Sequence, residues 1–187
     1  MLALWAVALL NGAYGIVELV AGFASGSQAL KADSLDFLGD GIITSFGIAA
    51  LGWKPAWRAR GALTQGIFLG LLGISVLATT ILRFSSAVPP EPEVMGLFGA
   101  LGFFVNVIAA SLMIRHRHGD AGVRAIWLFS RNDALGNIAV VIAAALVAGT
   151  DSPLPDLITA SIIAGLFLQS SWSIIRQASA ELRRTQP

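Results

Sequence analysis

Long apolar runs separated by short polar breaks account for almost the whole chain. The runs cover residues 2–24, 29–52, 62–82, 95–114, 124–148 and 154–176. Each is about as long as the roughly 20 residues that a helix needs to cross the hydrocarbon core of a bilayer. The breaks contain the Gly, Pro, Ser and charged residues that interrupt helices. The pattern predicts an all-α polytopic membrane protein, a single transmembrane domain of six helices over residues 1–187.

Basic residues are concentrated in alternate breaks, which sets the expected orientation. Only Lys31 and Arg83 border the odd-numbered breaks. The even-numbered breaks and the C-terminal end hold nine: Lys54, Arg58, Arg60, Arg115, Arg117, Arg124, Arg176, Arg183 and Arg184. Because short loops rich in Lys and Arg stay in the cytoplasm, both termini are expected there. We also expect no soluble domain after the sixth helix.

Composition supports this class and excludes others. Hydrophobic residues make up 56% of the 187 and charged residues 12%, against about 25% charged in an average soluble domain. Mean hydropathy is +0.76. The chain has no cysteine, so disulfides and thiolate metal ligands are excluded. A net charge of +1 gives no electrostatic basis for binding nucleic acid. The first run lacks a preceding basic stretch, which favours a spanning helix over a cleaved signal.

Three aspartates stand inside the second run, in the stretch ADSLDFLGDG. A charged side chain at mid-bilayer costs roughly 2.5–3.5 kcal/mol on insertion scales, so such residues need a partner or a function. Asp36 and Asp40 are four apart, hence on one helix face, where like charges repel. A divalent cation held by both carboxylates would relieve the repulsion. Alternatively, one aspartate caps the helix and another pairs with Lys31 or Arg131.

Other polar residues in the apolar runs are expected to line the same interior. Asp33, one turn before the pair, is either a group at the outer mouth of the site or a structural partner. In the fifth run, Asp133 and Asn137 share a face, and Asn137 is either a ligand or an interhelical hydrogen-bonding group. Asn11 and Glu18 share a face of the first run, where a structural hydrogen bond is the simplest role for each.

The stretches SGSQALKADSLDFLGDG and DALGNIAVVIAA, with NGAYGIVELVAGFASGS before them, resemble the cation diffusion facilitator family over essentially the whole chain. The resemblance implies a six-helix transporter, not an enzyme, in a bacterial inner membrane. It would export a divalent metal, zinc first and also cobalt or cadmium, in exchange for protons, and needs no cofactor. Matched to the family's paired motifs, Asp36, Asp40 and Asp133 are the metal ligands. A homodimer through the transmembrane helices is compatible with this assignment.

The chain departs from the family pattern at two points. The first member of the fifth-helix pair falls on Phe129, which cannot bind metal, so a water, Asn137, Ser130 or Asn11 must complete the shell. A site without histidine is less selective for zinc than a mixed nitrogen and oxygen site. Most members also carry a cytoplasmic C-terminal domain, which we expect this chain to lack.

The loop RHRHGDAG offers a further candidate site. In the family this loop is often rich in histidine and gathers cytosolic metal, a role that would fall here to His116, His118 and Asp120. The alternative is a solvated basic anchor at the membrane surface.

Two other functions are compatible with acidic residues in a membrane. An intramembrane aspartyl protease would need Tyr-Asp and Gly-x-Gly-Asp motifs, but Tyr14 is followed by glycine and the stretch Leu38-Gly39-Asp40 lacks the first glycine of the second motif. A passive cation channel or a non-transporting subunit would lack proton coupling. Close carboxylates in a low-dielectric site cannot all ionise, so we expect an empty antiporter site to hold protons that the metal displaces.

Phe129 provides a first test of the expected ligand set. Phe129→His would restore a His-x-x-x-Asp pair with Asp133, and imidazole favours zinc over harder cations. We expect tighter zinc binding in titration calorimetry. Unchanged zinc affinity would mean that residue 129 does not face the site.

Overall fold

The computed structural model describes residues 1–85, 88–114 and 121–184, with only the backbone described for 121–129. Within these ranges the chain forms six α-helices, and after α2 a single 3-10 turn, Ala50–Gly52. The α-helices are α1 (Leu2–Ser25), α2 (Gln28–Ala49), α3 (Pro55–Arg83), α4 (Pro92–Met113), α5 (Ala121–Thr150) and α6 (Leu154–Arg184). All six are long and apolar enough to cross a membrane, which confirms the expected fold class.

Two helices extend well beyond the apolar runs that predicted them. α3 begins at Pro55, where the ring fits the first helical turn because no intrahelical N–H bond is needed there. Its first turns carry Trp57 and Arg60, whose guanidinium lies 5.0 Å from the indole ring. α6 continues to Arg184. Hydropathy marks the part of a helix that meets lipid, and these helices continue past it with polar residues.

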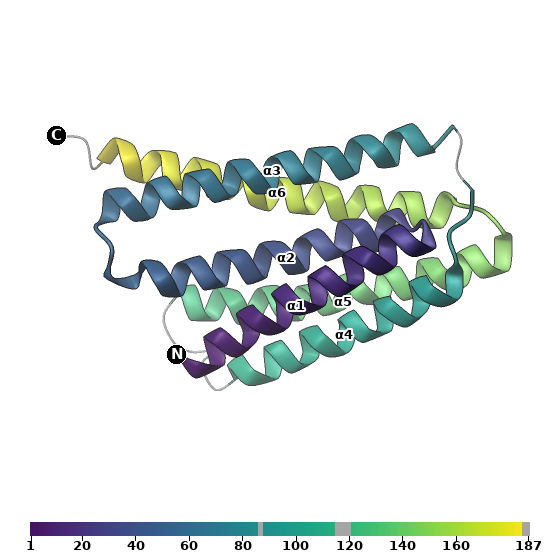
Figure 1. Ribbon diagram of the computed structural model, residues 1–187, viewed down its shortest axis with the longest axis horizontal. Coiled ribbons are helices and arrows are strands. Elements are labelled where there is room, and N and C mark those ends of the chain that lie inside the picture. The colour runs from purple at the N-terminus through teal and green to yellow at the C-terminus, as the bar shows by residue number, and fades with distance from the viewer. Residues whose placement is uncertain (86–87, 115–120, 185–187) are drawn as a thin grey trace.

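The helices form two groups, as Figure 1 shows. α1 packs along α2 and α4 along α5, whereas α3 packs along α6. The α3–α6 pair joins the other four helices chiefly through α6, which contacts α2 and α5. Both termini lie at the same end of the bundle, together with the connection from α2 to α3. An even number of spans requires that placement.

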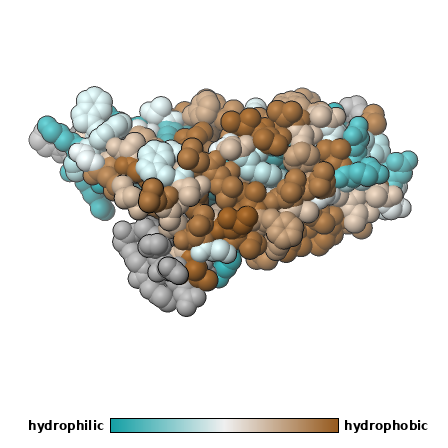
Figure 2. All heavy atoms as spheres, turned by 60° about the horizontal axis from the view of Figure 1, so that its bottom comes forward, coloured by the Kyte–Doolittle hydropathy of each residue, from teal (hydrophilic) through white to brown (hydrophobic). Residues whose placement is uncertain are grey.

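The outer surface is largely apolar. Figure 2 shows hydrophobic residues across the middle of the molecule and hydrophilic ones toward both ends. On α1, Leu9, Ile16 and Phe23 recur at seven-residue spacing and are 60–67% exposed. A soluble monomer rarely exposes so much contiguous apolar surface. The surface is therefore the one that faces lipid.

Glycines allow α1 and α2 to approach closely at the depth of the acidic residues. A Cβ atom placed on Gly41 would lie 2.9 Å from the backbone nitrogen of Gly12, and one on Gly15 would lie 2.9 Å from the Leu38 side chain. Helix pairs in membranes are held by such packing because lipid gives them no hydrophobic driving force to associate. This contact fixes which face of α2 turns toward α1 and which faces α5 and α6.

The end of the bundle opposite the termini is tied together by hydrogen bonds. The carboxylate of Asp156, in the first turn of α6, accepts the Ser27 hydroxyl at 2.6 Å and the backbone N–H groups of Gln28 and Ala29 at 2.9 Å each. Asp156 is 1% exposed. Nearby, the guanidinium of Arg83 on α3 donates to the carbonyl of Gly26. These bonds fasten the α1–α2 turn to both α6 and α3.

We expect Asp156→Asn to destabilise the protein. The amide can replace only one of the two acceptor oxygens, and hydrogen bonds to charged groups contribute about 1.5–3 kcal/mol each. Asp151→Asn is the matched control, because Asp151 is exposed and its φ of 50° suits asparagine. The Tm in detergent should fall by several degrees for Asp156→Asn and stay near wild type for Asp151→Asn. Equal values for the two variants would contradict a stabilising role of the Asp156 contacts.

Candidate metal centre

A cavity of about 530 Å³ opens between α2, α5 and α6. The wall from α6 runs from Phe167 to Gln177, about 15 Å along the helix. From Phe167 to Gln177, α6 runs toward the end of the bundle that carries both termini (Figure 1). The acidic residues in its wall are Asp36 and Asp40 of α2 and Asp133 of α5. The sequence-predicted ligand set is thus found on one open cavity.

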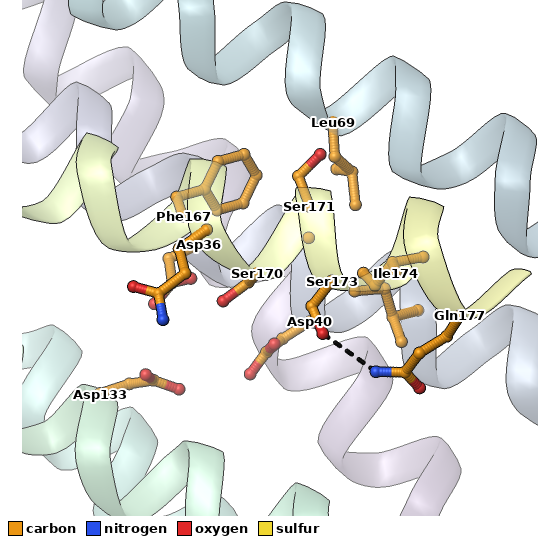
Figure 3. Close-up of a pocket in the computed structure, with 13 residues that line it drawn as sticks. Asp36, Asp40, Leu69, Asp133, Phe167, Ser170, Ser171, Ser173, Ile174 and Gln177 are labelled. Carbon is orange, nitrogen blue, oxygen red and sulfur yellow. Dashed lines mark hydrogen bonds between the residues drawn. The ribbon is translucent and has the colours of Figure 1, made fainter. Parts of the chain in front are cut away.

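The three carboxyl groups are neighbours across the contact between α2 and α5. Asp36 and Asp40 share a face because they stand one turn apart, and both are half-buried, as is Asp133. The Asp133 carboxyl is near enough to those of Asp36 and Asp40 to share a hydrogen bond with each when a proton is present. Figure 3 shows Asp133 reaching toward the α2 pair from the opposite wall. In the described part of the chain, no three acidic or histidine side chains are already grouped tightly enough to hold an ion.

The sequence left open that one α2 aspartate caps the helix and that another pairs with Lys31 or Arg131. The cap of α2 is Ser27, whose hydroxyl accepts from the backbone N–H of Leu30 at 3.1 Å. The ammonium of Lys31 lies 4.6 Å from the centre of the Phe23 ring. Arg131 is exposed and donates to the side chain of Asn132. Capping and the pairing with Lys31 therefore do not account for the acidic pair.

Of the additional ligands predicted from the sequence, three are buried and are not among the residues that line the cavity. Asn137 donates to the backbone carbonyl of Asp133 at 2.9 Å, and its Oδ1 fills the space beside Gly102 of α4. This position suits its predicted role as an interhelical contact. The other two, Ser130 and Asn11, each have a side-chain oxygen without a hydrogen-bond partner among the described residues.

Asp33 lies with Glu18 in a separate buried cluster between α1 and α2. The two carboxyl groups are near enough to share a hydrogen bond when one of them is protonated, and Glu18 Oε1 accepts the Tyr14 hydroxyl at 3.4 Å. Tyr14 also donates to the carbonyl of Phe98 on α4. Asp33 and Glu18 are at most 3% exposed. Asp33 therefore contacts Glu18 and is absent from the cavity wall.

Two sequence-derived expectations cannot be compared with the structure. The candidate loop site of His116, His118 and Asp120 lies outside the described residues, and so does the side chain of Phe129.

Sequence reasoning missed the polar face of α6. Gln169, Ser170, Ser173 and Gln177 all line the cavity, and Gln177 donates to Ser173 at 3.0 Å. Their three- and four-residue spacing places them along one side of the helix. The polar pattern is visible in the stretch QSSWSIIRQ. Neutral polar residues near the end of a membrane helix are common, however, so this pattern indicates a site less clearly than charges in the middle of a span.

The described helices are long and apolar enough to span a membrane, and three of their carboxyl groups line one open cavity. A family model described as the cation efflux transmembrane domain matches residues 4–183. The chain belongs to this family, whose members are transporters and not enzymes. It is therefore an integral membrane protein, and its bacterial relatives place it in the inner membrane.

Characterised relatives match nearly the whole chain at low identity. The chain is 28% identical to the zinc transporter ZitB of Escherichia coli over 92% of its own length and 59% of that protein. It is 26% identical to the cadmium, cobalt and zinc/H(+)-K(+) antiporter of Bacillus velezensis, over 93% of its own length and 60% of that protein. It is 25% identical to the metal cation efflux system protein CzcD of Cupriavidus metallidurans, over 90% of its own length and 57% of that protein. The chain thus spans less than two thirds of the length of these relatives.

Proposed function

We propose that this protein exports a divalent transition-metal cation from the cytoplasm in exchange for protons. The single observation that carries the proposal is the set of Asp36, Asp40 and Asp133 on one open cavity, contributed by two different helices. Carboxylate oxygens are suitable ligands for zinc, cobalt and cadmium, although they select weakly among them. The names of the relatives support this range of metals and the counter-transport of protons.

Proton coupling follows from the crowding of the carboxyl groups. Three negative charges this close in a membrane interior would repel strongly, so the empty site retains protons. A divalent cation supplies two positive charges and takes their place. Protons and metal therefore exclude one another, because the same carboxylate oxygens bind either. A transporter that returns to its cytoplasm-facing state only after the site has bound protons again exchanges metal for protons.

The fold offers a route for alternating access. The α6 wall of the cavity runs toward the end of the bundle that bears the termini, which the positive-inside pattern assigns to the cytoplasm. At the opposite end, Asp156 and Arg83 fasten the α1–α2 turn to α6 and α3. Outward release requires the α3–α6 pair to move against the other helices, and that motion closes the cytoplasmic side. The conformation described here is the one that loads metal.

Metal uptake by proteoliposomes tests the function. We expect zinc, cobalt or cadmium to enter vesicles containing the protein and to quench a metal-sensitive dye inside them. Asp133→Asn should abolish uptake because it removes the only carboxylate that α5 contributes to the cavity wall among the described residues. Asp151→Asn, an exposed change of the same kind, should leave uptake unchanged. Equal uptake by the wild type and Asp133→Asn would refute the assigned site.

A further inference from the structure

Ser170 lies on the α6 wall of the cavity, facing the three aspartates. Figure 3 shows its hydroxyl pointing into the gap between Asp36 and Asp40, with Asp133 on the far side. All four residues line the same cavity. Ser170 is exposed and lines that cavity.

The hydrogen bonding of Ser170 leaves its oxygen able to bind a cation. Its hydroxyl donates to the carbonyl of Leu166 in its own helix at 3.2 Å, which uses the hydrogen and leaves the lone pairs of Oγ free to accept. The neighbouring Ser171 differs, because it is buried and donates to the carbonyl of Gly66 on α3 at 2.7 Å. Ser171 joins α6 to α3, whereas Ser170 faces the acidic site.

We propose that Ser170 Oγ is a ligand of the transported metal, in addition to the three aspartates. The inference rests on the proposed function and extends its site to a third helix. Asp36, Asp40 and Asp133 supply three anionic ligands, and the phenylalanine at position 129 supplies none. A serine hydroxyl adds a neutral oxygen, which raises the coordination number without adding charge. The ligand set then consists of oxygen atoms from α2, α5 and α6.

A ligand on α6 has a mechanical consequence. α6 and α3 form the pair that moves against the other helices in the proposed cycle, while Asp36, Asp40 and Asp133 belong to the other group. An ion bound by both groups holds them together. Binding of metal would therefore stabilise one arrangement of the α3–α6 pair over the other, which is the differential affinity that any ligand-driven change requires.

The absence of cysteine from the sequence permits a direct spectroscopic test. Ser170→Cys places a thiol where the hydroxyl stood, and a thiolate bound to Co²⁺ produces an intense charge-transfer band in the near ultraviolet. We expect this band on adding Co²⁺ to Ser170→Cys in detergent. Ser173→Cys, one turn along the same wall, and Ser75→Cys, on the exposed face of α3, should bind Co²⁺ without it.

Affinity provides the second readout. Ser170→Ala should weaken Co²⁺ binding by roughly tenfold and change its visible spectrum, because one oxygen ligand is lost. Ser75→Ala should change neither. No band in Ser170→Cys, or an equally strong band in Ser173→Cys, would overturn the assignment to Ser170. Failure of the wild type to bind Co²⁺, or normal binding by Asp40→Ala, would instead refute the proposed function.

Discussion

Asp40→Ala is expected to abolish metal binding while leaving a folded protein. The substitution removes one of the two α2 carboxylates on the cavity, so an ion would keep only Asp36 and Asp133 as charged ligands. Loss of a group that merely supports a metal ligand costs about 10–100-fold in affinity, and loss of the ligand itself should cost more than 100-fold. Titration calorimetry with zinc in detergent measures the change.

Stability separates a lost ligand from a lost fold in this experiment. Asp40 lies one turn from Asp36, and removing it relieves the repulsion between two like charges on one helix face. The Tm without metal should therefore stay the same or rise. Added zinc should raise the Tm of the wild type, because a ligand that binds only the folded state stabilises it, and should not raise that of Asp40→Ala. Wild-type zinc affinity in Asp40→Ala would contradict the site.

The second large effect concerns pH. Carboxylates must lose their protons to bind metal, so the affinity should fall steeply as pH decreases. With protons shared among Asp36, Asp40 and Asp133, metal binding should also release protons, on the order of one or two per ion. Calorimetry in buffers of different ionisation enthalpy, from about pH 5.5 to 8, measures both quantities.

The histidines of the loop after α4 need a control in that experiment. Histidine becomes charged below about pH 6.5, so metal binding by His116 and His118 would also make the metal affinity fall as pH decreases. The measurement therefore uses His116→Ala/His118→Ala as the background. The pH dependence and the proton release should persist there. A flat affinity without released protons would remove the basis for antiport and favour a passive channel.

Hydrophobic patterning predicted the helices better than their ends. The six runs were recognisable because a bilayer requires about 20 apolar residues in succession. The start of α3 at Pro55 and the end of α6 at Arg184 were missed because those turns lie beyond the apolar region. The contact between Asp156 and the start of α2 could not be predicted, since it joins residues more than 120 positions apart.

The acidic site was accessible to sequence reasoning for a different reason. Asp36, Asp40 and Asp133 stand out because charge in a bilayer is costly and therefore rare. Ser170 carries no charge, and a serine in a membrane helix commonly bonds to the carbonyl four residues earlier, as Ser170 does with Leu166. Only the three-dimensional arrangement distinguishes it from Ser171, which faces α3. Neutral ligands in membrane proteins need structural information for that reason.

Counter-transport of protons in proteoliposomes tests the central claim most directly. Vesicles are loaded with a pH-sensitive dye, and zinc is added outside without an imposed pH gradient. We predict that zinc entering through the wild-type protein drives protons out, so the interior becomes more alkaline at a rate that follows zinc uptake. Asp36→Asn/Asp40→Asn/Asp133→Asn vesicles should show neither signal. Zinc uptake by the wild type with no change in internal pH, in vesicles made permeable to potassium with valinomycin, would contradict proton antiport.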